Sequence, residues 1–226
     1  MKIVIEKTAD GSTTLYREDI DEHYHSVKGA LAESLHVYLE TGWRKATDTS
    51  RNIRVFEVGF GTGLNAAITA YAALESNIPT EYYSVELYPL PKNTTNLIHD
   101  TLEEKYRDPF KLVNDSPWNE RIDINPFFSL LKLEDNLLIM NLPTELDVVY
   151  FDAFAPEKQP EMWDETIFRK LYKAMKPGAV LTTYCAKGNI RRMLQQIGFL
   201  TERLPGPPGG KREILRATKL SGNMIC

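Results

Sequence analysis

Hydrophobic and polar positions follow two alternating patterns along the chain. Short runs rich in β-branched and aromatic residues predict strands, and longer segments with apolar residues three and four apart predict helices. Beyond residue 50 the two patterns take turns, with strands predicted near 54–58, 81–86, 127–133, 147–152, 179–184, 199–204 and 213–218, and helices near 64–75, 91–104, 163–175 and 188–197. This order predicts an α/β fold with a doubly wound, mostly parallel sheet and an antiparallel hairpin at its C-terminal edge.

The first 50 residues have a different pattern. Residues 3–6 and 14–17 predict a β-hairpin around a turn at 9–12, and a helix is predicted over 29–41, where Leu31, Leu35 and Tyr38 have helical spacing. Gly42 is the predicted end of that helix. We therefore interpret residues 1–50 as an N-terminal extension packed on a core domain of residues 51–226. Residues 105–126 are polar and interrupted by prolines, and the sequence assigns no element to them.

Composition places the chain among ordinary globular proteins. It has 226 residues, of which 42% are hydrophobic and 26% charged. No apolar run approaches the length of a membrane helix, and the first residues lack a signal-peptide core. Two cysteines, Cys185 and Cys226, and four scattered histidines offer no disulfide framework or metal-ligand spacing. We expect a cytoplasmic protein without a bound metal.

The charge is unevenly distributed. The net charge is −4, but residues 187–226 contain eight basic residues against two acidic ones, so that this part carries +6 and the first 186 residues carry −10. A basic end on an acidic body is typical of a face that meets a polyanion, although a solvated helix and tail would have the same composition.

Three glycines, Gly59, Gly61 and Gly63, separate the strand at 54–58 from the helix at 64–75. A strand, a glycine turn and a helix bring backbone N–H groups close to a nucleotide-like ligand. The spacing is G-x-G-x-G, tighter than the G-x-G-x-x-G that accommodates a pyrophosphate. It favours a nucleoside whose tail is not a phosphate, and S-adenosylmethionine is the commonest ligand of that description.

Acidic residues end the next three parallel strands. Glu86 is placed to bind ribose hydroxyls, Asp135 to accept from an adenine amino group, and Asp152 to face the space where a substrate meets the cofactor. Each one alone could be a solvated carboxylate or could cap a turn. Four such features in the right order favour a ligand site.

Three motifs resemble those of a known family, namely residues 58–65, 152–163 and 210–213. Two further segments support the resemblance, namely residues 24–34 and residues 188–192 followed by Gly198-Phe199. Over nearly its whole length the chain resembles the methyltransferase domain of the MnmC type, which acts in 5-methylaminomethyl-2-thiouridine synthesis at the tRNA wobble position. The resemblance implies S-adenosyl-L-methionine as the cofactor. It implies cofactor contacts from Glu33, Ser34, Glu57, Gly59, Phe60, Gly61, Thr62, Gly63, Asn65, Glu86 and Asp135.

The expected substrate is the primary amine of 5-aminomethyl(-2-thio)uridine. Asp152 is the expected catalytic residue, because its carboxylate can accept a hydrogen bond from the amine and orient it. Phe154 is the expected wall for a flipped uridine, unless it only packs in the core. The expected contacts to phosphates of the anticodon stem-loop come from Arg191, Lys211 and Arg212.

Bifunctional members of the family carry a flavin-dependent oxidase domain as well. This sequence has no second glycine fingerprint and is therefore expected to resemble the stand-alone methyltransferase. Two other functions fit parts of the pattern. An aminopropyltransferase of the spermidine-synthase type would use the same fold, and a non-catalytic module would bind the cofactor or RNA without transferring a group.

Overall fold

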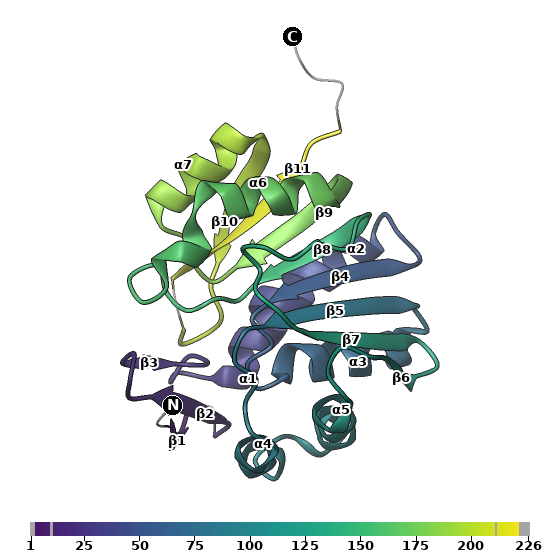
Figure 1. The fold of residues 1–226 in the computed structure, drawn as a ribbon, viewed down its shortest axis with the longest axis vertical. Helices are drawn as coiled ribbons and strands as arrows, with labels where there is room; N and C mark the ends of the chain where they lie inside the picture. Colours follow the sequence, from purple (N-terminus) through teal and green to yellow (C-terminus); the bar gives the residue numbers. More distant parts are fainter. Residues whose placement is uncertain (1–2, 10, 211, 222–226) are drawn as a thin grey trace.

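The computed structural model of this chain describes residues 3–9, 11–210 and 212–221, and an eight-stranded sheet runs through it (Figure 1). In spatial order the strands are β10 (Phe199–Pro205), β11 (Glu213–Lys219), β9 (Met175–Thr183), β8 (Leu146–Phe151), β4 (Ile53–Val58), β5 (Thr80–Glu86), β7 (Phe128–Glu134) and β6 (Arg121–Asn125). The pairings among β9, β8, β4, β5 and β7 are parallel, whereas β6, β10 and β11 pair antiparallel. The predicted mostly parallel sheet with an antiparallel C-terminal hairpin is confirmed.

Helices cover both faces of this sheet. Successive residues of a strand point to opposite faces, so Val55 and Val148 belong to one buried cluster while Phe56 and Val149 belong to the other. The first cluster includes residues of α3 (Leu64–Ser76) and α5 (Glu104–Asp115), and the second includes residues of α6 (Glu165–Ala174) and α7 (Gly188–Ile197). All of β8 is buried, which explains why its sequence reads as a continuous apolar run.

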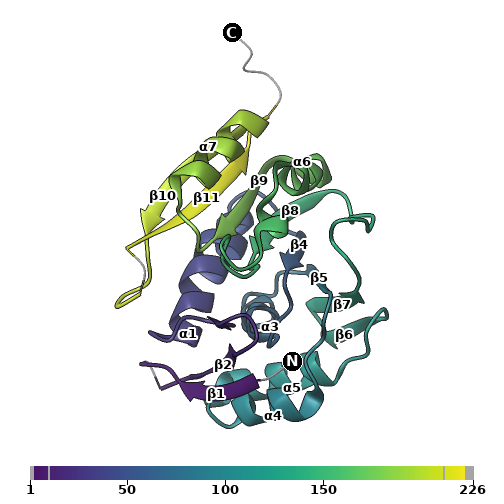
Figure 2. The ribbon, with the colours of Figure 1, turned by 60° about the vertical axis from the view of Figure 1, so that its left-hand side comes forward.

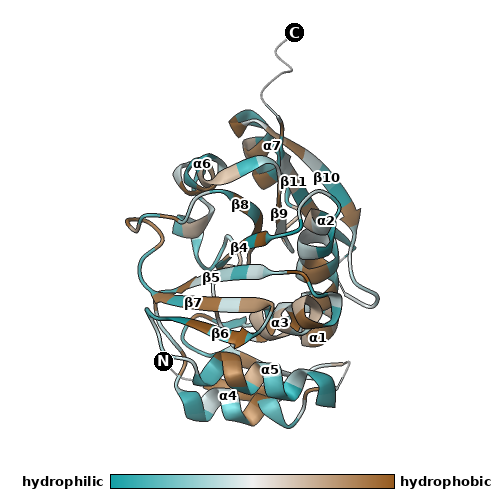
Figure 3. Ribbon diagram, turned by 90° about the vertical axis from the view of Figure 1, so that its right-hand side faces the viewer, coloured by the Kyte–Doolittle hydropathy of each residue, from teal (hydrophilic) through white to brown (hydrophobic). Residues whose placement is uncertain are grey.

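The segment 105–126 contains regular structure that the sequence did not indicate. It provides most of α5 and the edge strand β6, and α4 (Lys92–His99) lies beside α5. Tyr106, Phe110 and Val113 of α5 are buried at helical spacing. The other positions are mainly polar and Pro109 lies inside the helix, so the apolar stripe is narrow. Figure 3 shows hydrophilic and hydrophobic residues mixed along α4 and α5.

The N-terminal helix is longer than predicted. It consists of α1 (Ala30–Glu33), a π-helical stretch η1 (Ser34–Trp43) and α2 (Arg44–Thr47). The prediction that Gly42 ends the helix is wrong, because Gly42 lies inside it, against the sheet. A Cβ atom at Gly42 would lie only 2.8 Å from Cε1 of Tyr150, so the glycine permits close packing of helix and strand. π-helical turns are rare and often occur at functional sites.

A small antiparallel sheet precedes this helix. It is formed by β1 (Ile3–Lys7), β2 (Thr13–Arg17) and β3 (Glu22–His23) (Figure 1). The antiparallel pairing of β1 with β2 confirms the predicted hairpin (Figure 2). Residues 30–46 share the buried cluster of α3 and β8. The division of the chain at residue 50 stays a prediction. Among the described helices, none has the length and apolar character needed to cross a membrane.

Replacing Gly42 with alanine tests the close packing of the N-terminal helix. Alanine should gain about 1 kcal/mol of helix propensity, but the added methyl group must displace the buried Tyr150 ring, and overpacking of this kind costs about 1–3 kcal/mol. We expect Gly42→Ala to lower the free energy of unfolding by about 1 kcal/mol, measured by urea denaturation. The exposed substitution Lys45→Ala in the same helix should change it by less than about 0.5 kcal/mol. A clear gain in stability for Gly42→Ala would contradict the packing argument.

Candidate active site

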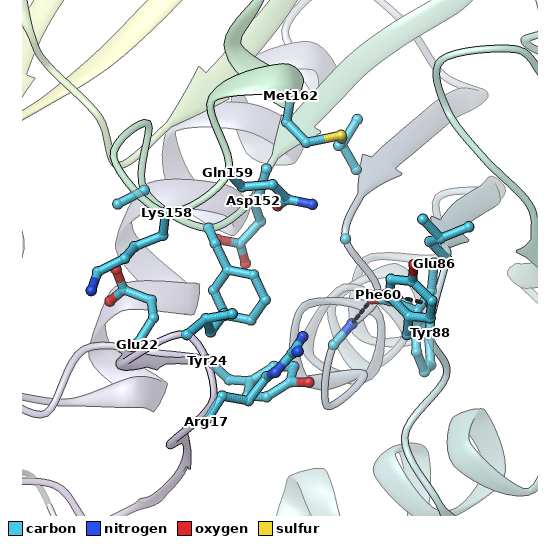
Figure 4. Close-up of a pocket in the computed structure, with 18 of the residues that line it drawn as sticks. Arg17, Glu22, Tyr24, Phe60, Glu86, Tyr88, Asp152, Lys158, Gln159 and Met162 are labelled. Atoms are coloured by element: carbon cyan, nitrogen blue, oxygen red, sulfur yellow. Dashed lines mark hydrogen bonds between the residues drawn. The ribbon is translucent and has the colours of Figure 1, made fainter. Parts of the chain in front are cut away.

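The strand ends that the sequence singled out meet at one edge of the sheet. Strands β8, β4, β5 and β7 are neighbours and parallel, so their carboxyl ends lie side by side. Gly59, Gly61, Glu86, Asp135 and Asp152 all line one cavity of about 440 Å³ at this edge. Figure 4 shows Asp152 on one side of this cavity and Glu86 with Tyr88 on the other.

The glycine turn is held tightly against the end of β8. Gly59, Gly61 and Gly63 have backbone φ angles of 88°, 50° and 80°, which residues other than glycine rarely adopt. A Cβ atom at Gly59 would lie 2.7 Å from the backbone oxygen of Asp152. The turn and the Asp152 loop therefore touch through their backbones.

Glu86 is tied to the glycine turn. The backbone N–H of Gly61 donates to Glu86 Oε2 over 3.2 Å, and the N–H of Tyr88 donates to Oε1 over 3.1 Å. Burial raises the pKa of Glu86 above its ordinary value, and these N–H groups oppose that shift. The carboxylate is thus oriented before any ligand arrives.

Asp152 is held by two side chains from different elements. The hydroxyl of Tyr38, in the π-helical stretch, donates to Asp152 Oδ1 over 2.5 Å, and Asn65 Nδ2, in the first turn of α3, donates to Oδ2 over 2.8 Å. Tyr38 is almost fully buried. Each carboxylate oxygen therefore has a fixed donor, which sets the plane of the group at the cavity.

The N-terminal segment closes the cavity from the side of β2 and β3. Tyr24 contacts Phe154 edge to face at 5.2 Å, and a Cβ atom at Gly61 would lie 3.2 Å from the Tyr24 ring. The Arg17 guanidinium carbon lies 5.7 Å from the centre of the Phe154 ring. In Figure 4, Arg17 and Tyr24 lie between the Asp152 side and the Glu86 side of the cavity. Nothing in the sequence pattern assigned Arg17, Tyr24 or Tyr38 to the site.

His25 joins this segment to the glycine turn. Its Nε2 shares a 2.8 Å hydrogen bond with the hydroxyl of Thr62, and its backbone N–H donates to Thr14 Oγ1 over 3.0 Å. Burial lowers the pKa of His25 to about 4, so the ring is neutral at physiological pH. The N-terminal segment is therefore fastened to the turn by an uncharged contact.

The predicted cofactor residues divide into two groups. Glu33, Gly59, Phe60, Gly61, Glu86 and Asp135 line the cavity. Ser34, Glu57, Thr62, Gly63 and Asn65 are not part of its lining, and those of them with polar side chains are buried behind it. Direct contact of this second group with the cofactor stays a prediction. The structure shows another role for two of them, because Asn65 donates hydrogen bonds to both Asp152 and Glu57.

The predicted RNA contacts lie outside the cavity. Arg191 is half-buried in α7, its neighbour Arg192 is exposed, and Arg212 is exposed between β10 and β11, while Lys211 falls outside the described residues. Several other basic residues of this region pair with acidic ones: Lys187 with Glu157, Arg203 with Glu213 and Arg216 with Glu202. Glu202 and Glu213 are already included in the sequence count of +6, so of these pairs only that of Lys187 with Glu157 lowers the charge available to a polyanion.

The residues around the cavity fit S-adenosylmethionine. The glycine turn leaves no room for side chains where its backbone meets Asp152. The charged residues that line the cavity are mostly carboxylates, namely Glu22, Glu33, Glu86, Asp135, Asp152 and Glu161, against Arg17 and Lys158. Such a lining suits a ligand with a sulfonium and an ammonium group. Within the described residues, no cluster of three histidines, cysteines or carboxylates could hold a metal ion.

The strand order, the glycine turn and the acidic strand ends define a class I S-adenosylmethionine-dependent methyltransferase fold. A profile of the S-adenosyl-L-methionine-dependent methyltransferase family matches residues 111–220. The crystal structure of MNMC2 from Aquifex aeolicus has a TM-score of 0.80 with 28% sequence identity, and the match covers 96% of this chain and 70% of that one. Spermidine synthase from Thermotoga maritima shares the fold, with a TM-score of 0.61 and 15% identity.

Similarity to proteins of known function narrows the kind of methyltransferase further. The tRNA 5-methylaminomethyl-2-thiouridine biosynthesis bifunctional protein MnmC of Cupriavidus necator is 32% identical over 216 residues, which are 90% of this chain and 32% of that protein. The MnmC protein of Leptospira interrogans is 28% identical over 92% of this chain and 34% of its own length. This chain spans about a third of the length of these relatives. Over about nine tenths of its length the chain is similar to MnmC proteins, and S-adenosyl-L-methionine is its cofactor.

The burial of His25 should make the fold sensitive to acid. The folded protein binds a proton at His25 only near pH 4, whereas the unfolded chain binds it near pH 6.5. The unfolded state therefore holds more protons between these values, and stability falls as the pH drops through that window. From pH 7 to pH 5 this linkage should cost about 2 kcal/mol, measured by urea denaturation at both pH values.

His25→Gln should remove most of that loss, because glutamine does not titrate. His99→Gln, a substitution at the end of α4, should keep the wild-type dependence. An unchanged loss in His25→Gln would show that other groups cause the acid sensitivity.

Proposed function

We propose that this chain transfers a methyl group from S-adenosylmethionine to the primary amine of 5-aminomethyl(-2-thio)uridine at the wobble position of tRNA. The observation that carries the proposal is the Asp152 carboxylate, held by Tyr38 and Asn65 at the cavity where the glycine turn also lies. The names of the relatives support the substrate, since they describe biosynthesis of 5-methylaminomethyl-2-thiouridine in tRNA.

The protein contributes mainly by positioning. When bound, the cofactor supplies an electrophilic methyl group on a sulfonium sulfur. Asp152 accepts a hydrogen bond from the substrate amine and directs the nitrogen lone pair away from itself, toward the cofactor side of the cavity. The nitrogen–methyl bond forms as the sulfur–methyl bond breaks, and the secondary ammonium then loses its extra proton to water. Correct orientation of two reactants is worth about 7–11 kcal/mol.

Asp152 serves better as an orienting residue than as a strong base. A carboxylate close to an amine also favours its protonated form, which cannot attack. The two fixed hydrogen bonds from Tyr38 and Asn65 restrict how the carboxylate can turn, so that it meets the amine in one direction.

A uridine can enter beside Phe154. The Phe154 ring contacts Tyr24 and lies near the Arg17 guanidinium, and all three residues line the cavity. Aromatic rings and a guanidinium plane are the groups on which unstacked RNA bases are held. Arg192 and Arg212, together with the predicted Lys211, are proposed to bind phosphates around the modified nucleotide.

The activity can be tested directly with labelled S-adenosylmethionine. The purified protein is incubated with tRNA that carries unmethylated aminomethyluridine, with fully modified tRNA, with putrescine and without an acceptor. We expect label only in the first reaction, recovered as 5-methylaminomethyl(-2-thio)uridine after digestion. In a parallel reaction with putrescine and decarboxylated S-adenosylmethionine, a polyamine product would favour an aminopropyltransferase. Binding of the cofactor without transfer of any group would favour a non-catalytic module.

Asp152→Asn should separate orientation from cofactor binding. The amide keeps the size of the side chain but presents N–H groups where the amine needs an acceptor. We expect kcat to fall by about 10²-fold or more, while the Kd of S-adenosylhomocysteine changes only a few-fold. Asp100→Asn, an exposed substitution after α4, should leave both values unchanged. Wild-type kcat in Asp152→Asn would exclude the proposed role.

The phosphate contacts can be tested through salt dependence. Reversing both charges in Lys211→Glu/Arg212→Glu should weaken tRNA binding and reduce the slope of log K against log salt by about 2, roughly 1 for each lost contact. Arg51→Glu, an exposed reversal just before β4 and so at the opposite edge of the sheet, is the matched control. Equal effects of the two reversals would indicate a general charge effect and no defined RNA face.

A further inference from the structure

A buried carboxylate lies directly behind the site. Glu57 of β4 has no exposed surface, yet no described lysine, arginine or histidine forms an ion pair with it. Its partners are neutral: the Ser84 hydroxyl donates to Oε2 over 2.7 Å, and Asn65 Nδ2 donates to Oε1 over 3.0 Å. Burying a carboxylate without a cation is costly while it is ionised.

The same amide links Glu57 to Asp152. An asparagine side chain has two N–H donors, and Asn65 directs its nitrogen to Glu57 Oε1 and to Asp152 Oδ2. Its own oxygen is buried and has no hydrogen-bond partner. The Asn65 amide therefore donates to both carboxylates while its oxygen stays without a hydrogen bond. This orientation indicates that the negative charge of the two carboxylates determines which way the amide points.

The other titratable groups around Glu57 are tyrosines and Asp152, and none of them carries a positive charge. Tyr82 of β5 and Tyr150 of β8 face it, and Tyr38 of the π-helical stretch donates to Asp152. Burial raises the pKa of Glu57 to about 8, with the charge of Asp152 adding to the shift and the bonds from Ser84 and Asn65 opposing it. Two carboxylates coupled in this way titrate as a pair.

We propose that Glu57 and Asp152, joined by Asn65, form a carboxylate pair that responds to the charge on the cofactor sulfur. Without cofactor the pair retains one proton. Binding of the sulfonium of S-adenosylmethionine makes a second negative charge favourable, and the proton leaves to solvent. The product S-adenosylhomocysteine has a neutral sulfur, so the pair takes a proton back from solvent.

This response would favour the methyl donor over the product. A pair that releases a proton only to the donor binds the donor more tightly as the pH rises, by linkage. Glu57 acts as a positioning residue here, because it reaches the cavity only through Asn65 and Asp152. The inference depends on the cofactor and does not require the proposed tRNA substrate.

Calorimetry with both ligands measures the released proton. Binding enthalpies of S-adenosylmethionine and S-adenosylhomocysteine at pH 7.0–7.5 are compared in buffers with different ionisation enthalpies. The ionisation of each free ligand is titrated separately and subtracted, because the sulfonium lowers the pKa of the amino group of S-adenosylmethionine relative to that of S-adenosylhomocysteine. We expect S-adenosylmethionine to release several tenths of a proton more than S-adenosylhomocysteine.

Glu57→Gln should abolish this difference, because glutamine keeps the shape of the side chain but cannot hold the proton. Glu75→Gln, an exposed substitution at the end of α3, should retain it. Equal release for both ligands in the wild-type protein, or an unchanged difference in Glu57→Gln, would overturn the proposal.

A second measurement needs only the wild-type protein. The ratio of the two Kd values should shift in favour of S-adenosylmethionine as the pH rises from about 6 to 8 and then level off. A ratio that does not change with pH would also overturn the proposal. Neither result depends on methyl transfer to tRNA, so the failure of this inference and the failure of the proposed function can be told apart.

Discussion

The contact between the glycine turn and the end of β8 is the constraint on which the site depends. Val58 pairs with Phe151 in the parallel ladder, and the N–H of Asp152 donates to the Val58 oxygen over 3.0 Å. At the next residue the two backbones meet so closely that Gly59 has no space for a Cβ atom. This pairing brings Asp152 beside the glycine turn, although Gly59 and Asp152 are more than ninety residues apart.

The electrostatics of the site follow from what is buried around that contact. Asp152 and Glu57 share the Asn65 amide, and Glu86 is held by backbone N–H groups of the glycine turn and of Tyr88. The donors in these hydrogen bonds, an amide and backbone N–H groups, are neutral. The negative charge of the carboxylates is therefore left to interact with a cationic ligand, which suits the sulfonium of the cofactor.

The N-terminal segment completes the cavity that the core begins. Tyr24 packs on Gly61 and Phe154, and His25 is hydrogen-bonded to Thr62, so the segment touches both the glycine turn and the Asp152 loop. The π-helical stretch then brings Tyr38 to Asp152. A core of strands and helices alone would leave the cavity open to water on this side.

The sequence by itself determined the alternating core and the place of the site. Parallel strands bring their carboxyl ends to one edge, so the glycines, Glu86, Asp135 and Asp152 could be assigned to one cavity from chain order alone. The sequence did not reveal α5 and β6, whose apolar stripes are narrow, or that the helix runs past Gly42, because its packing on Tyr150 is a long-range contact.

Only the tertiary structure decided which side chains act together. Local spacing says nothing of contacts between segments far apart in the chain, such as Tyr38 with Asp152 or Arg17 with Phe154. The family resemblance grouped Glu57 and Asn65 with the cofactor residues, and only the fold shows that both are buried and that Asn65 joins Glu57 to Asp152. The same holds for the basic C-terminal region, where Lys187 forms an ion pair with Glu157, a residue outside that region. Hydrophobic periodicity is a local property and can be read along the chain, but hydrogen bonds and ion pairs between distant segments exist only once the chain has folded.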